Sequence, residues 1–204
     1  MITKYKSTNN KEDAILTQKA KKSVKSFEEL YRKYANKVFN YFWYRTGHNK
    51  PLSEDLMQET FLRAFKNREK YKDQGYSYLT YLLTIAHNLL VDYYRKPKSI
   101  PVEELPINAM PYEIADELTK KYEAEALWRA IQSLSQKNRD ILMMFYQQEM
   151  PVRDIAKVMG MTENAVKLNL SRTRKKLANH PYLQDIVLFS DAKRKHTKPR
   201  FLEK

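Results

Sequence analysis

The chain of 204 residues has no cysteine, which excludes a disulfide framework and any metal site built on thiolates. No apolar run approaches the roughly 20 residues that a membrane-spanning helix needs, and the N-terminus lacks the apolar segment of a signal peptide. We therefore expect no metal, no cofactor, no membrane insertion and a cytoplasmic location. The histidines are also too scattered to form a ligand pair one helical turn apart, at His48, His87, His180 and His196.

Glycine is scarce as well, since only Gly47, Gly75 and Gly160 occur in the chain. The hydrophobic fraction of 42% is nevertheless sufficient for a buried core. Apolar residues recur at three-to-four spacing over long stretches, and this period is typical of amphipathic helices. We predict an all-α fold of two small helical domains joined by a flexible acidic linker.

Acidic residues are fewer than basic ones: the chain has 24 Asp and Glu and 38 Lys and Arg, which gives a net charge of +14. A surplus of this size favours a polyanionic partner, with nucleic acid ahead of an anionic membrane surface. The alternative is a basic surface that serves solubility alone. The uneven distribution of the charge along the chain argues against that alternative.

Charge and proline divide the sequence into five segments. Residues 1–25 hold seven lysines and few large apolar residues, so we expect a mobile or loosely helical basic arm. Packed helical domains are expected at 26–96 and 119–180, with an acidic, proline-containing linker at 97–118 between them. Residues 181–204 are expected to form a basic C-terminal tail.

Apolar periodicity predicts three helices in the first domain. They are expected to begin after Ser26 as an N-cap, near Ser53, and near Ser77. The buried stripe of the middle helix is predicted to consist of Met57, Phe61 and Phe65. In the second domain, inward-facing positions are predicted at Leu127, Ala130, Ile131, Leu134, Ile141, Leu142 and Phe145.

The segment from Pro151 to Leu177 has the features of a helix-turn-helix. Gly160 supplies the positive φ that the turn needs, Thr162 is a candidate cap for the second helix, and Val166 is expected to pack against the small Ala156. Five basic residues and no acid lie between Val166 and Leu177, so the second helix is suited to the major groove of DNA. The alternative is a two-helix corner with a solvated basic face.

Two blocks of sequence narrow the function further. Ser53–Phe65 closely resembles the core helix of region 2 in bacterial sigma factors, and Tyr81–Arg95 resembles the helix that follows it. Resemblance to region 4 lies in Leu134–Arg139, Asp154–Ala156 and Val166–Leu177. The order of these blocks and the short linker are similar to the extracytoplasmic-function class, which keeps only regions 2 and 4.

The resemblance implies a sigma factor that joins core RNA polymerase, recognises promoter −35 and −10 elements and promotes DNA melting. On core polymerase it implies contacts with the clamp of the largest subunit and the flap region of the second largest, and it makes an anti-sigma factor a possible further partner. The implied −35 contacts are Lys167, Leu168, Asn169, Ser171, Arg172, Arg174 and Lys175. The implied contacts to the melted −10 strand are Tyr76, Ser77, Tyr78, Tyr81, His87, Asn88 and Arg95. The implied contacts to core polymerase are Asp55, Gln58, Glu59 and Arg63.

The chain departs from the family pattern at several positions. Tyr81 stands where tryptophan is usual, Ser135 where proline is usual, and Asn169 where arginine is usual, while Asn164-Ala165 replaces Gly-Thr. The changes in the second helix of the helix-turn-helix bear on −35 sequence preference and not on duplex binding.

Other interpretations of the same residues stay open at this point. Tyr76 or Tyr78 is equally consistent with a core aromatic, and the polar face around Asp55 with a solvated surface. The whole chain is also compatible with a helix-turn-helix regulator that acts without polymerase. An enzyme is not expected, because no carboxylate pair, nucleophile–base set or phosphate loop is visible.

Overall fold

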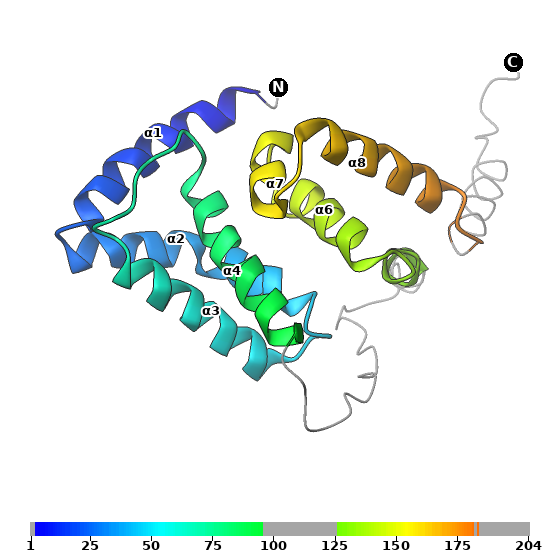
Figure 1. Ribbon diagram of the computed structural model, residues 1–204, viewed down its shortest axis with the longest axis horizontal. Helices are drawn as coiled ribbons and strands as arrows, with labels where there is room; N and C mark the ends of the chain where they lie inside the picture. The colour runs from blue at the N-terminus through cyan, green and yellow to red at the C-terminus, as the bar shows by residue number, and fades with distance from the viewer. Residues whose placement is uncertain (1–2, 96–125, 182, 184–204) are drawn as a thin grey trace, which may run out of the picture. The chain divides into compact units, whose positions relative to one another are not determined.

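The computed structural model describes residues 3–95, 126–181 and 183, and its regular secondary structure within these ranges is entirely helical (Figure 1). The described residues form two compact units, one of 3–95 with 150–163 and one of 126–149 with 164–183. The all-α prediction is confirmed. The predicted linker at 97–118 and nearly all of the predicted tail at 181–204 lie outside the described residues. None of the described helices is long and apolar enough to cross a membrane.

The first unit begins with α1 (Thr3–Ala20), which packs against α2 (Val24–Trp43) and α4 (Tyr78–Arg95) (Figure 1). Its buried residues Asp13, Thr17 and Ala20 are spaced by three and four positions, so they lie on one face of the helix. The expectation of a mobile or loosely helical arm allowed for the helix but missed this buried face, because two of its three residues are polar and the third is small.

Helix α2 begins three residues earlier than predicted. Ser23 is its N-cap, and the Ser23 hydroxyl accepts a hydrogen bond from the backbone N–H of Ser26 at 3.3 Å. Ser26 therefore lies in the first turn and not at the cap. The apolar stripe of α2 faces the core as expected, with Phe27, Leu30, Tyr34, Val38, Tyr41 and Phe42 buried.

Helix α3 (Lys50–Lys66) also begins before its predicted start. The Asn49 side chain caps it by accepting from the backbone N–H of Leu52 at 3.0 Å. Ser53, the predicted start, is instead fully buried in the first turn, where its hydroxyl bonds the Asn49 carbonyl at 2.7 Å. The buried stripe is consequently rotated from the prediction: Phe61 is buried, but Met57 and Phe65 are only half-buried, and the other buried positions are Leu56, Thr60 and Ala64.

Helix α4 agrees with its predicted extent and packs against both α2 and α3. Its apolar residues supply the largest share of the core of this unit, at Leu79, Leu82, Leu83, Ala86, Leu89 and Leu90. The three helices therefore enclose one core, and α1 covers a further side of it (Figure 1).

The second unit contains a helical segment at 126–132, α6 (Gln136–Tyr146) and α8 (Glu163–Ala178), whose first residue belongs to the other unit. Ala130, Ile131, Leu134, Ile141 and Leu142 are buried as predicted. Leu127 was predicted to face inward, but 44% of it is exposed, and Ala126 is buried instead. Phe145 is half-buried.

The turn between α7 (Val152–Met159) and α8 has the predicted geometry. Gly160 adopts φ 61° and ψ 37°, in the left-handed region that glycine reaches without steric cost. The N–H of Gly160 bonds the carbonyl of Lys157, and the N–H of Met161 bonds the carbonyl of Ala156 at 2.9 Å. This pair of bonds is the Schellman pattern that ends a helix.

Gly160→Ala is expected to lower the free energy of unfolding by about 1 kcal/mol, because alanine pays the cost of the left-handed conformation. No atom lies within 4 Å of the position that a Cβ would take, so the cost is conformational and not a clash. Gly160→Asn is the matched control, since asparagine tolerates this region better. Urea unfolding measures all three chains. If the Gly160→Ala variant were as stable as the natural chain, the assignment of a left-handed conformation to residue 160 would be wrong.

Candidate nucleic-acid interface

A pocket of about 480 Å³ lies where the loop between α3 and α4 meets the first turns of α4. Its side chains are polar, basic and aromatic, which is the combination that holds unpaired bases and their phosphates. They come from Asn67, Lys70, Tyr71, Lys72, Gln74, Tyr76, Ser77, Thr80, Tyr81, Thr84 and Lys157. The structure thus brings together Tyr76, Ser77 and Tyr81 of the predicted −10 set.

Four tyrosines form a continuous cluster at this pocket, hereafter the tyrosine cluster: Tyr71 and Tyr81 line the pocket, and Tyr34 and Tyr78 lie behind them. The ring centroid of Tyr71 lies 4.8 Å from that of Tyr81 and 5.3 Å from that of Tyr78, and Tyr78 lies 5.5 Å from Tyr81. Tyr34 meets Tyr78 from α2 at 6.1 Å. Burial raises the pKa of each of the four hydroxyls, to about 12 for Tyr71.

The two loop tyrosines have different environments. Tyr78 is only 3% exposed and is a core residue, whereas Tyr76 is half-buried and lines the pocket. The sequence left open whether these tyrosines are core aromatics or exposed candidates for DNA contact. Tyr78 is a core aromatic, and Tyr76 is accessible in the pocket. Tyr78 therefore reaches the pocket only through the neighbouring rings.

Polar groups of α7 hold the start of α4 within the first unit. The Asp154 carboxylate is buried and accepts hydrogen bonds from the Ser77 N–H at 3.3 Å, the Ser77 hydroxyl at 3.1 Å and the Thr80 hydroxyl at 2.5 Å. A negative charge at a helix N-terminus is favoured by the helix dipole. Arg153 donates to the Gly75 carbonyl and lies 4.5 Å from the Tyr76 ring. Sequence reasoning missed both contacts, since each joins residues more than 70 positions apart.

Helix α4 continues the pocket wall with residues one turn apart. Tyr81, Thr84, Asn88 and Arg95 follow helical spacing along one face, and the Asn88 side chain is exposed. His87 does not join them, because its Nδ1 lies 3.1 Å from the Tyr41 hydroxyl of α2. Burial and the nearby Arg45 lower the pKa of His87, so its imidazole is neutral at physiological pH. The prediction that His87 contacts DNA has no support from this placement.

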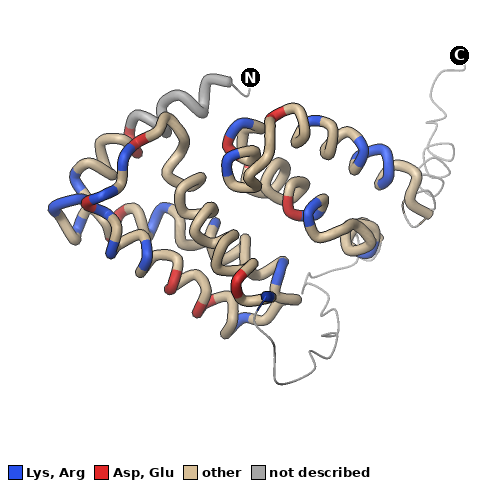
Figure 2. Tube along the Cα trace, viewed as in Figure 1, with Lys and Arg blue, Asp and Glu red and all other residues tan. Residues whose placement is uncertain are grey.

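The second helix of the helix-turn-helix, α8, is divided between a buried and a basic face. Val166, Leu170 and Thr173 are buried and form its inner side. The opposite side presents an exposed stripe, hereafter the α8 stripe, of Asn164, Lys167, Leu168, Ser171, Arg172 and Lys175. The acid of α8 is confined to Glu163 at its first residue, and Figure 2 shows Lys and Arg at several places along the rest of the helix. Asn164 belongs to this stripe but was absent from the predicted −35 set.

Two predicted −35 residues have side-chain partners inside the second unit. The Asn169 amide donates to the Asn138 side chain of α6 at 2.7 Å, which turns it away from the α8 stripe. The Arg174 guanidinium donates to the Tyr146 hydroxyl at 2.7 Å and lies over the rings of Phe145 and Tyr146. Arg174 is still exposed, so these contacts orient its charge at the edge of α8 without burying it.

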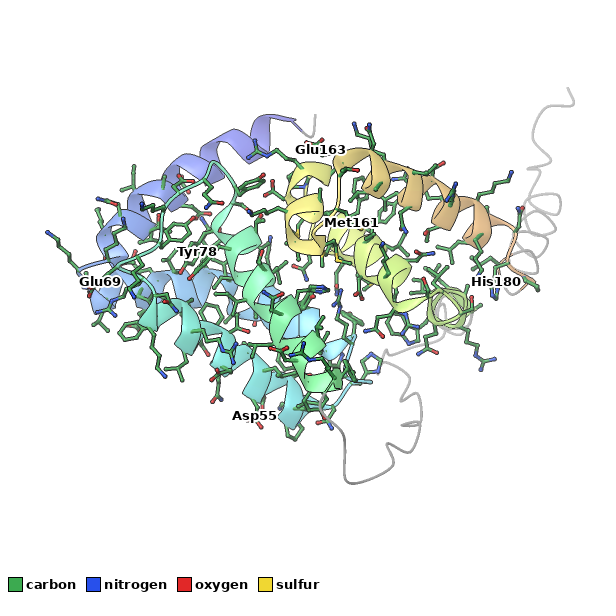
Figure 3. All side chains as sticks on the ribbon, viewed as in Figure 1. Asp55, Glu69, Tyr78, Met161, Glu163 and His180 are labelled. Atoms are coloured by element: carbon green, nitrogen blue, oxygen red, sulfur yellow. The ribbon has the colours of Figure 1, made fainter. Side chains whose placement is uncertain are left out.

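A second concave surface of about 490 Å³ lies between α2 and α3 and is hereafter the α2–α3 groove. Its floor is aromatic, with Tyr31 packed edge-on against Phe61 at 4.7 Å and Phe27 against Phe65 at 5.0 Å. The residues that line it are Phe27, Tyr31, Asp55, Gln58, Glu59, Phe61, Leu62 and Phe65. Asp55, labelled in Figure 3, and two other predicted polymerase contacts therefore lie on one surface.

Arg63, the fourth predicted polymerase contact, is ion-paired with Glu59 at 2.6 Å and lies beside the groove. Leu62 was missed by the sequence analysis although 45% of it is exposed in the groove. Leu62 follows Phe61 off the buried stripe of α3, and a leucine on the polar side of an amphipathic helix is the sequence signal that could have marked it.

Comparison with known proteins gives two family matches. The chain matches the Sigma-70 region 2 model over residues 30–100 and the Sigma-70 region 4 model over residues 124–177. It is 31% identical to the ECF RNA polymerase sigma factor BldN of Streptomyces coelicolor over 157 residues, which is 75% of this chain and 59% of BldN. It is 28% identical to the RNA polymerase sigma factor YlaC of Bacillus subtilis, covering 74% of this chain and 90% of YlaC.

Solved structures share the fold. A structure of CnrH in complex with the cytosolic domain of CnrY has a TM-score of 0.60 at 20% identity, covering 81% of this chain and 94% of that one. The sigma factor RpoE in complex with the anti-sigma factor NepR from Bartonella quintana has a TM-score of 0.62 at 21% identity, covering 79% of this chain and 98% of that one. At these identities the likeness supports the fold alone.

The raised pKa values of the tyrosine cluster predict alkaline sensitivity. A folded pKa above the unfolded value of 10.0 means that the stability contribution is complete below pH 10. It is then lost as the pH rises toward about 12, the pKa of folded Tyr71. The free energy of unfolding should therefore fall across this interval, and tyrosinate absorbance should show late-ionising groups. Tyr71→Phe should weaken this fall in stability; an unchanged pH profile would contradict the prediction.

Proposed function

The chain belongs to the extracytoplasmic-function class of RNA polymerase sigma factors, and we propose that three of its surfaces divide the work of promoter recognition. Sigma factors bind core RNA polymerase and direct it to promoters. In this proposal the pocket beside the α3–α4 loop takes the melted −10 strand, the α8 stripe contacts the −35 duplex, and the α2–α3 groove binds polymerase.

The pocket beside the α3–α4 loop suits an unpaired base for two reasons. The half-buried rings of Tyr71, Tyr76 and Tyr81 provide apolar faces for stacking, which single-stranded DNA requires. Lys70 and Lys72 are exposed on its rim, where they attract phosphates. Ser77 and Tyr76 already have partners on α7, so in this proposal an entering base exchanges with those partners.

Helix α4 supplies the hydrogen-bonding groups that a stacked base needs for recognition. The Asn88 side chain is exposed one turn beyond Thr84, which lines the pocket. A carboxamide both donates and accepts, so it matches one edge of an unpaired base. We assign Asn88 to a base next to the pocket and leave His87 out of the site.

The α8 stripe is suited to duplex DNA. Lys167, Arg172 and Lys175 are exposed on one side of a helix that has no acid beyond Glu163. Leu168 is 50% exposed between them, and an apolar side chain in the major groove contacts the methyl group of thymine. Asn164, near the helix N-terminus, is placed to pair with adenine. Asn169 is assigned a positioning role through Asn138.

The α2–α3 groove differs from both DNA surfaces in its charge. Asp55 and Glu59 border it, and its floor is aromatic. An acidic rim repels phosphates, whereas an exposed aromatic floor is the usual centre of a protein–protein contact. We therefore assign it to the clamp of polymerase. This separation of acidic and basic surfaces is the observation that best supports the whole proposal.

Regulation by an anti-sigma factor stays a prediction for this chain. The similar RpoE structure holds such a complex, with NepR. No surface of the described residues is assigned to it in this proposal.

Transcription by core polymerase on a library of promoters, with and without the purified chain, tests the function. The chain should produce promoter-specific transcripts and co-purify with core. Leu62→Asp should weaken core binding at least tenfold, because a buried charge replaces an apolar contact. Val24→Asp is the matched control, since Val24 is 65% exposed at the first residue of α2 and does not line the groove. Specific DNA binding without core association would favour an independent regulator instead.

Two adjacent lysines of α8 offer a matched pair for the −35 contact. Lys175 lies in the α8 stripe, whereas the equally charged and exposed Lys176 lies outside it. Lys175→Ala should reduce the slope of log affinity against log salt by about one on −35 duplex DNA, the effect of one lost phosphate contact. Lys176→Ala should leave the slope nearly unchanged. Equal slopes for the two variants would show that the face of α8 has been assigned wrongly.

A further inference from the structure

Helix α1 lies before residue 30, where the region 2 family match begins, yet it places a charged group in the core of the first unit. Asp13 is only 4% exposed. A buried carboxylate is costly unless its oxygens are paired, so its position requires specific partners.

Both carboxylate oxygens of Asp13 have a partner on α2. The Tyr34 hydroxyl donates to one oxygen, and the Lys33 ammonium lies 2.7 Å from the other. These charge-assisted bonds are directional and stronger than neutral ones. They hold the Tyr34 ring at one position, and burial together with the Asp13 carboxylate raises the pKa of Tyr34, which keeps its hydroxyl a donor.

Tyr34 continues the path toward the pocket. Its ring packs against Tyr78 at 6.1 Å, and Tyr78 packs against Tyr71 and Tyr81 at 5.3 and 5.5 Å. The last two rings line the pocket. Tyr78, labelled in Figure 3, is the first residue of α4 and the ring through which Tyr34 reaches the other two. Asp13 does not line the pocket. It is connected to the pocket wall through its bond to Tyr34 and two successive ring contacts.

We infer that α1 is a working part of the −10 site, with Asp13 as a positioning residue that orients the tyrosine cluster for stacking on an unpaired base. This inference rests on the proposed role of the pocket. Asp13 acts through the Tyr34 hydroxyl, so its removal should disturb capture of the melted strand and leave the α8 stripe and the α2–α3 groove intact.

The test uses the full chain with core polymerase and a promoter that carries 2-aminopurine, a fluorescent adenine analogue, in the −10 non-template strand. Asp13→Asn should slow opening about tenfold, the loss expected from one charge-assisted hydrogen bond, and leave closed-complex affinity unchanged. Glu12→Gln is the matched control, because Glu12 is the exposed neighbour of Asp13 on the same helix. It should open at the rate of the natural chain.

A double-mutant cycle separates positioning from general stability. Asp13→Asn removes the charge that strengthens the hydrogen bond from Tyr34, and Tyr34→Phe removes its donor. Both changes act on one interaction, so the double variant should open no more slowly than the slower single variant. Additive effects, or equal opening rates for Asp13→Asn and Glu12→Gln, would overturn the inference. So would a loss of core and −35 binding that parallels the loss of opening, since that pattern indicates global destabilisation.

Tyr81→Ala in the natural background tests the underlying assignment of the pocket. It should abolish the fluorescence change of 2-aminopurine on opening. If the fluorescence change persisted in the Tyr81→Ala chain, the assignment of the pocket to the −10 strand would be wrong, and the inference about Asp13 with it. If Tyr81→Ala abolished the fluorescence change but Asp13→Asn did not alter it, only the positioning role of Asp13 would be wrong.

Discussion

Burial of Tyr78 is the constraint on which the pocket beside the α3–α4 loop, the proposed −10 site, depends. The ring is 3% exposed at the first residue of α4, where it contacts Tyr34 of α2 and Tyr71 of the preceding loop. Its position sets where α4 begins and how the loop approaches it. The polar groups of this junction are also satisfied, since Ser77 and Thr80 both bond Asp154. A loop with such fixed ends presents Tyr76 and Tyr81 in a defined geometry, which lowers the entropic cost of capturing a flexible strand.

Helix α8 combines a buried face with an exposed face that is proposed to contact DNA. Its buried residues recur three and four positions apart, and the positions between them are free for recognition. Residues at the border of the two faces have mixed roles: Asn169 bonds Asn138, and Arg174 is oriented by Tyr146. The departure from the usual arginine at position 169 is then understandable, because an amide fits a short bond to α6 that a guanidinium would overreach.

The sequence predicted what periodicity and backbone chemistry determine, and missed what depends on tertiary partners. Helix α4 and the turn at Gly160 agree with the structure because a long apolar repeat and a left-handed glycine leave few alternatives. The starts of α2 and α3 were misplaced because several serines and asparagines nearby are equally good caps. The buried roles of Asp13 and Asp154 and the Tyr41 partner of His87 were not foreseen, since such contacts depend on residues distant in sequence.

The sign of the charge on each surface provides selectivity that shape alone would not. Acidic residues border the α2–α3 groove, whereas lysine and arginine dominate the α8 stripe and the rim of the pocket. In the proposed division of surfaces, this charge pattern favours DNA at the other two surfaces over the groove. With a net charge of +14 the chain is drawn to any duplex. Sequence discrimination must then come from a few groups at close range, of which Leu168, Asn164 and Asn88 have the required exposure and chemistry.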